Sequence, residues 1–170
     1  MPDKEEQVLV IPRKLLEKPG KFQGLCFNTA PYLPLLLNSR NHRFIPRSQA
    51  EQNSDLKQLI PYFIICHQDR IWSYVRGKKS GEGRLVSCMS IGIGGHINNL
   101  DENLFEDIYT RAATRELEEE IFLPPGWTQT IMALLNDDTT PVGSVHLGVV
   151  HCLRTPSADV RRKEAAITEA

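Results

Sequence analysis

The chain has 170 residues, with 41% hydrophobic and 24% charged positions, and a mass of 19.3 kDa. This is the composition of one folded domain, and it excludes a disordered or collagen-like chain. Lys and Arg number 20 and Asp and Glu 21, so the net charge is -1 and bulk nucleic-acid binding is not expected. We also expect no membrane span and no signal peptide, because the apolar stretches are short and the start is acidic. Four cysteines without CxxC spacing suggest reduced thiols in a cytoplasmic protein.

The first third of the chain is mixed in pattern. It predicts a strand at 7–11, a short helix at 12–18, a turn at 19–20, an apolar segment at 32–37 and a loop-rich stretch at 40–55. We expect residues 1–57 to form an N-terminal extension that packs on a domain spanning 58–170.

The pattern is clearer from residue 59 onward. Alternating and β-branched residues predict a hairpin of strands 59–67 and 70–75, and a strand at 85–93 that ends in glycines. A long helix is predicted at 104–122, with capping-box spacing between Asn103 and Glu106 and a stop at Pro124. Strands at 127–135 and 145–153 follow. The fold class is therefore α+β, with a mixed or antiparallel sheet and one dominant helix.

Three glutamates of the predicted helix share one side of it. Glu116, Glu119 and Glu120 stand at i, i+3 and i+4, so their carboxylates converge and repel one another. A hard divalent cation would turn this repulsion into coordination, and oxygen-only ligands favour Mg²⁺ or Mn²⁺. From these residues alone, a solvated acidic patch on the surface of a plain interaction domain is the simpler interpretation, and the metal site is the alternative.

The string Arg115-Glu116-Leu117-Glu118-Glu119-Glu120, with Gly95 and Asp107 upstream, resembles the signature of the Nudix hydrolase superfamily. That signature is G-x5-E-x7-R-E-U-x-E-E-x-G-U, where U is a bulky aliphatic residue, and the similarity extends over 59–153. The chain departs from the signature in three ways: the loop after Gly95 is lengthened, Asp107 replaces a glutamate, and Phe122 replaces a glycine. The resemblance implies the Nudix fold, a mixed β-sheet sandwiched between helices, here with a shortened C-terminus.

The resemblance also implies a site. Glu116, Glu119, Glu120 and the Gly95 carbonyl would bind the metal, while Glu119, Glu116 and Arg115 would be the catalytic residues, with Arg115 orienting the acids. The implied activity is Mg²⁺- or Mn²⁺-dependent hydrolysis of a phosphoanhydride bond in a nucleoside-diphosphate-linked or similar small phosphorylated substrate. The alternative is a non-catalytic Nudix module that binds a nucleotide or metabolite.

Basic residues near the glycine-ended strand are candidates for substrate binding. Arg76, before the cationic loop 77–83, would meet substrate phosphates, unless that loop is only a hairpin turn. His96 follows the double glycine and would either line the pocket or pack within its loop. His146 and His151 are five residues apart in a predicted strand and should face opposite sides. The sequence leaves open whether the chain forms a homodimer.

Overall fold

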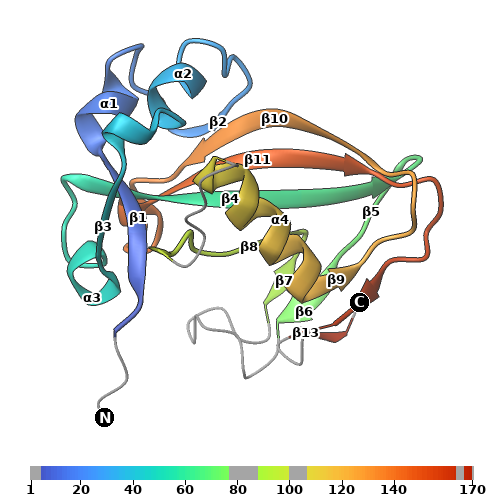
Figure 1. Ribbon diagram of the computed structural model, residues 1–170. Helices are drawn as coiled ribbons and strands as arrows, with labels where there is room; N and C mark the ends of the chain where they lie inside the picture. Colours follow the sequence, from blue (N-terminus) through green and yellow to red (C-terminus); the bar gives the residue numbers. More distant parts are fainter. Residues whose placement is uncertain (1–4, 77–87, 100–106, 164–166, 170) are drawn as a thin grey trace.

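The fold is built on one long, central strand. The computed structural model describes residues 5–76, 88–99, 107–163 and 167–169. Strand β4 (Leu56–His67) pairs in parallel with β11 (His146–Arg154) and antiparallel with β1 (Gln7–Pro12). The main sheet is therefore mixed, as predicted, and Figure 1 shows β4 running through its middle.

Eight strands make up this main sheet, in the order β2-β10-β11-β4-β1-β3, with β5 and β8 also paired to β4. The remaining strands are β2 (Gly24–Cys26), β3 (Arg43–Pro46), β5 (Arg70–Ile71), β8 (Gly92–Gly94) and β10 (Thr128–Asn136). Strands β1, β2 and β3 come from residues 7–46, so the N-terminal third contributes directly to the sheet.

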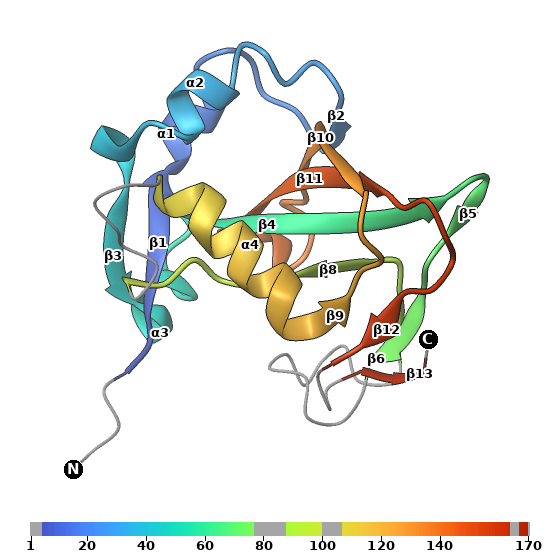
Figure 2. The same ribbon diagram turned by 45° about the vertical axis from the view of Figure 1, so that its right-hand side comes forward.

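Helices cover both faces of the sheet. On one face, α4 (Ile108–Glu120), α1 (Arg13–Glu17) and α2 (Leu33–Leu36) contribute to the larger core cluster, which includes Leu59 and Phe63 of β4. On the other face, α3 (Arg47–Ala50) places Ala50 against Val8 and Val10 of β1. Figure 2 shows α4 lying across β4 and β8, and the expected sheet between helices is confirmed.

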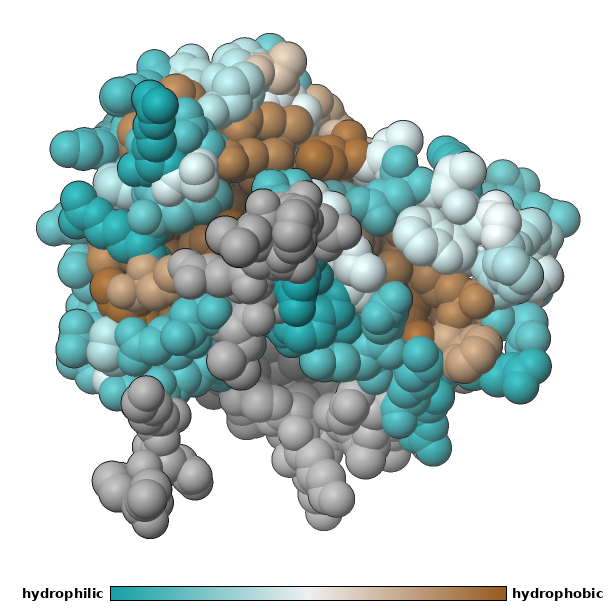
Figure 3. Space-filling model, in the orientation of Figure 1, coloured by the Kyte–Doolittle hydropathy of each residue, from teal (hydrophilic) through white to brown (hydrophobic). Residues whose placement is uncertain are grey.

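The strand alternation explains this two-sided packing. Successive side chains of a strand point to opposite faces, and in β4 the buried Leu59, Phe63 and Ile65 share the face that α4 covers. The outer side of α4 is hydrophilic in Figure 3, and hydrophobic residues show on either side of it, toward α2 and toward β9 (Ile121–Phe122).

Helix α4 is shorter than predicted at both ends. Asp107 has extended backbone and is the N-cap, because its side chain accepts a hydrogen bond from the Thr110 amide at 2.8 Å. At the other end, Ile121 already belongs to β9, which pairs with β12 (Arg161–Arg162). The helix therefore ends four residues before Pro124, and the predicted stop at that proline is wrong. The predicted capping pair Asn103 and Glu106 lies outside the described residues.

Two other predicted segments differ from the structure. The stretch 40–55, expected to be loop-rich, contains β3 and α3. The predicted strand 85–93 is divided in its described part, because β7 (Met89–Ser90) pairs with β6 (Tyr74–Arg76) whereas β8 pairs with β4. The predicted hairpin of 59–67 with 70–75 is confirmed in part, because β5 pairs with β4 whereas, among the described strands, β6 pairs with β7 and not with β4.

The C-terminal residues add short strands, β12 and β13 (Ile167–Glu169), and β13 pairs with β6. The expected C-terminal shortening and the expected division at residue 57 stay predictions. Among the helices that the structure describes, none is long and apolar enough to cross a membrane.

Candidate active site

The glycine end of β8 lies directly against α4. A Cβ atom on Gly95 would overlap the Glu116 carboxylate, and one on Gly94 would collide with the Pro61 carbonyl of β4. Only glycine permits both approaches at once, because it has no side chain to displace these groups. The predicted juxtaposition of the glycine-ended strand and the acidic helix is therefore present, and it places the Gly95 backbone beside Glu116.

Arg115 holds two of the predicted acids together. Its Nη1 lies 2.6 Å from Glu116 Oε1 and 3.1 Å from Glu119 Oε2, and its Nη2 donates to the His96 carbonyl at 3.1 Å. We call Arg115, Glu116, Glu119 and the His96 carbonyl the Arg115 cluster. The Glu116 side chain is 12% exposed and that of Glu119 53%, so the cluster runs from the core edge into solvent.

His96 links this cluster to the start of β11. Its Nε2 lies 3.2 Å from Nε2 of His146, whose Nδ1 donates to the Val142 carbonyl at 2.7 Å. Burial lowers the pKa of His146, which favours the neutral ring. With the proton on Nδ1, the other nitrogen of His146 accepts, so His96 donates to it. The His96 ring thus contacts His146 while its carbonyl contacts Arg115, and its predicted place in a substrate pocket stays a prediction.

The other predicted site residues lie as follows. Glu120 is half-buried at the last position of α4, and its carbonyl accepts from the Lys163 amide at 2.7 Å. Arg76 belongs to β6, and its side chain is outside the described part of the structure. Asp107, at the position of the signature glutamate, accepts from both the amide and the hydroxyl of Thr110, so it caps the helix.

The candidate ligand atoms are of the chemical type that a hard divalent cation binds. The Glu116 and Glu119 carboxylates and the adjacent Gly95 carbonyl are all oxygen ligands, the class that Mg²⁺ and Mn²⁺ prefer. Both carboxylates already converge on one positively charged nitrogen of Arg115. Within the described residues, however, no group of three Asp, Glu, His or Cys side chains is arranged to hold a metal ion.

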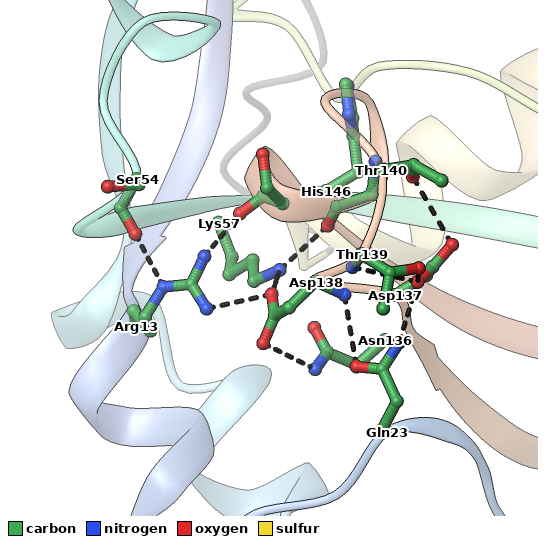
Figure 4. A network of polar contacts seen from close by, with 12 residues as sticks. Arg13, Gln23, Ser54, Lys57, Asn136, Asp137, Asp138, Thr139, Thr140 and His146 are labelled. Carbon is green, nitrogen blue, oxygen red and sulfur yellow. Dashed lines mark hydrogen bonds and ion pairs between the residues drawn. The ribbon is translucent and has the colours of Figure 1, made fainter.

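A second polar network, which the sequence did not reveal, lies on the loop that leads into His146. Lys57 is fully buried, and its Nζ donates to Asp138 Oδ1 at 2.7 Å and to the Gly143 carbonyl at 2.8 Å (Figure 4). Arg13 Nη1 lies 2.8 Å from the same Asp138 oxygen, and its guanidinium also donates to the Ser54 and Ser144 carbonyls. We call Arg13, Lys57 and Asp138 the Arg13–Lys57 network.

Burial and charge oppose each other in this network. Burial lowers the pKa of Lys57 despite its bond to Asp138. Burial alone would raise the pKa of Asp138, but hydrogen bonds from Lys57 and Arg13 lower it to about 2. The network fixes the loop between β10 and β11, and this loop supplies the Val142 carbonyl that orients His146. In the sequence, this network appears only as an isolated lysine and an Asp-Asp pair in a polar loop. Neither pattern indicates that these residues contact each other.

Comparison with known proteins identifies close similarity over nearly the whole chain. Protein YmaB of Bacillus subtilis (strain 168) is 34% identical over 167 residues, which cover 94% of this chain and 81% of YmaB. The crystal structure of Tm1382, which carries an assignment as a Nudix hydrolase, superposes with a TM-score of 0.73 at 28% identity. That alignment covers 95% of this chain and 81% of Tm1382. No protein-family model matches the chain.

Proposed function

We propose, because the chain belongs to the Nudix superfamily of hydrolases, that it cleaves a phosphoanhydride bond with the help of Mg²⁺ or Mn²⁺. The substrate class would be a small molecule linked to a nucleoside diphosphate, or a similar diphosphate. The similarity to Tm1382 supports this proposal, since the alignment covers 95% of this chain.

The observation that supports this proposal most directly is the geometry of the Arg115 cluster. One guanidinium contacts two carboxylates and the carbonyl that follows Gly95, so the helix and the glycine-ended strand are held in a fixed relation. Pre-positioned groups lower the cost of assembling a reactive geometry. A surface helix with an idle acidic face would not need this link to the strand.

Each residue of the cluster has a distinct proposed task. Glu116, which is largely buried, would be the fixed ligand, and Glu119, which is half-exposed, would face the substrate and the attacking water. Glu120 and the Gly95 carbonyl would complete the oxygen ligands, and Arg115 would keep the carboxylates oriented. A bound divalent ion would neutralise diphosphate charge and favour attack of water at phosphorus.

A hydrolysis screen with matched glutamine variants tests the proposal. The wild type, Glu119→Gln and Glu120→Gln would be assayed with Mg²⁺ and Mn²⁺ against a panel of nucleoside-diphosphate-linked compounds. Glu118→Gln is the matched control, since Glu118 is an exposed glutamate of the same helix outside the triplet. We expect turnover to fall at least about 100-fold in the two test variants and to persist in the control. Unchanged turnover in both test variants would contradict the assigned roles.

A non-catalytic ligand-binding module is the second candidate, and Asp107 is the observation that favours it. Both of its carboxylate oxygens bond to Thr110, so the residue at the signature glutamate position serves the helix end. Tight binding of a diphosphate compound without turnover, with either metal, would support this candidate over the hydrolase.

A further inference from the structure

A cavity of about 380 Å³ lies along the N-terminal half of α4. Thr110 and Thr114 line it from the helix, and strands β10 and β11 form its opposite wall. Five residues separate Thr114 from Glu119, which at about 100° per residue places them about 140° apart around the helix. Thr114 therefore faces away from Glu119, and no residue of the Arg115 cluster lines the cavity.

The wall of the cavity contains a chain of hydrogen bonds that runs from the buried Tyr109 to the exposed Gln129. His151 Nε2 lies 2.5 Å from the Tyr109 hydroxyl, and its Nδ1 lies 2.8 Å from Gln129 Nε2. An amide nitrogen can only donate, so His151 accepts at Nδ1 and donates its own proton to Tyr109. The Tyr109 hydroxyl is thereby left with its hydrogen to donate elsewhere.

This wall is electrically neutral near pH 7. Burial lowers the pKa of His151 to about 4 and raises that of Tyr109 well above its usual value. Asp107 also lines the cavity, and its carboxylate would repel an anion, while the strand wall offers no cation to pair with one. The cavity therefore suits a molecule without negative charge that can form hydrogen bonds.

The remaining lining narrows the choice of ligand. Leu37, Ala113 and Ile131 provide apolar surface, and the volume is within the range of small-molecule sites, about 300–1,000 Å³. Gln129 is exposed, and within the described residues its carbonyl oxygen and second amide hydrogen have no partner. A glutamine amide that offers one donor and one acceptor side by side matches the edge of a nucleobase such as adenine.

We propose that this cavity is a second binding site, selective for an uncharged nucleobase or nucleoside, with Gln129 reading the base edge between Leu37 and Ile131. It is separate from the Arg115 cluster and does not depend on the hydrolytic function proposed above. The Tyr109 hydroxyl would donate a further hydrogen bond to the ligand.

Isothermal titration of the full chain with adenosine, guanosine, cytidine and uridine tests this site. We expect at least one nucleoside to bind with a Kd below about 1 mM, and Gln129→Leu and Thr114→Tyr to weaken it at least tenfold. Both positions are exposed, so these variants should fold, and a thermal melt would check this. The matched control Thr128→Val should keep the wild-type Kd, because Thr128 is exposed on the same strand and does not line the cavity.

A fourth variant separates this site from the proposed active site. Glu119→Gln should retain nucleoside binding in full, whether or not the chain hydrolyses any diphosphate. The proposal would be overturned if no nucleoside bound below 1 mM, if binding survived both cavity variants, or if Glu119→Gln abolished it.

Discussion

The Arg115 cluster and the Arg13–Lys57 network are built from the same kinds of groups in opposite proportions. In the Arg115 cluster, one cation contacts two carboxylates, and the outer carboxylate, of Glu119, is 53% exposed. In the Arg13–Lys57 network, two cations share one carboxylate, and the Lys57 side chain is fully buried. Among the contacts between described residues, carboxylates outnumber cations in the first site, which reaches solvent, and cations outnumber carboxylates in the second, which reaches the interior.

This difference indicates two different contributions. A buried charge is costly unless it is paired, so Lys57 makes the fold depend on Asp138. The ion pair between Arg115 and the half-exposed Glu119 contributes little to stability, so the Glu119 carboxylate is available to bind a cation at small cost to the fold. Charge balance and burial together therefore distinguish the Arg13–Lys57 network, which is structural, from the Arg115 cluster, which is a candidate ligand site. Four predictions on the free energy of unfolding test this distinction.

Asp138→Asn should have the largest effect. It leaves the buried Lys57 without its counter-ion, and the free energy of unfolding should fall by about 3 kcal/mol or more. Urea denaturation at pH 7 measures this. Asp159→Asn is the control, because Asp159 pairs with Arg161 at the surface, where the loss should stay below about 1 kcal/mol. Equal losses in the two variants would contradict the structural role of the network.

Lys57→Met should cost about 2 kcal/mol, since it removes the buried charge but leaves the Gly143 carbonyl without its donor. The double variant with Asp138→Asn should lose less than the sum of the two single losses, because the groups interact directly. Additive losses in this cycle, again from urea denaturation, would show that Lys57 and Asp138 act independently.

Acid should weaken the Arg13–Lys57 network at low pH. The folded-state pKa of Asp138, about 2, lies below its unfolded value of 3.8, so its contribution is present above about pH 4 and is lost as the pH falls through 2. Unfolding midpoints compared between pH 5 and 2 should fall more steeply for the wild type than for Asp138→Asn. Parallel slopes would rule out this contribution.

Arg115→Gln should change the free energy of unfolding least, by less than about 1 kcal/mol. The same variant should lower any hydrolytic turnover at least about tenfold, because the two carboxylates lose the group that orients them. Arg111→Gln, on the same helix but outside the cluster, should leave both measurements unchanged. If Arg115→Gln instead lowered the free energy of unfolding strongly and kept full turnover, the Arg115 cluster would have a structural role. That result would contradict the contrast drawn with the Arg13–Lys57 network.

The parts predicted from sequence are those that depend on nearby residues. The spacing of Arg115, Glu116 and Glu119 within one helix fixes their neighbourhood, and the structure brings them together. The central strands were also predicted, because their alternation and β-branched content are local signals.

The parts that were missed depend on distant partners. Lys57 and Asp138 are 81 positions apart, and His96 and His146 are 50 apart, so no local pattern connects them. The end of α4 was misplaced for the same reason, since Ile121 leaves the helix to pair with Arg162 of β12. Within 40–55, β3 forms by pairing with β1. The local sequence there is polar and did not predict a strand.

The tight contact at Gly95 has a practical consequence. Because a Cβ atom there would overlap the Glu116 carboxylate, Gly95→Ala would displace that acid while every ionisable group of the chain remained present. A single added methyl group would then separate recognition of a ligand from its chemical conversion. Such a variant is a suitable starting point for trapping an intact ligand for crystallography.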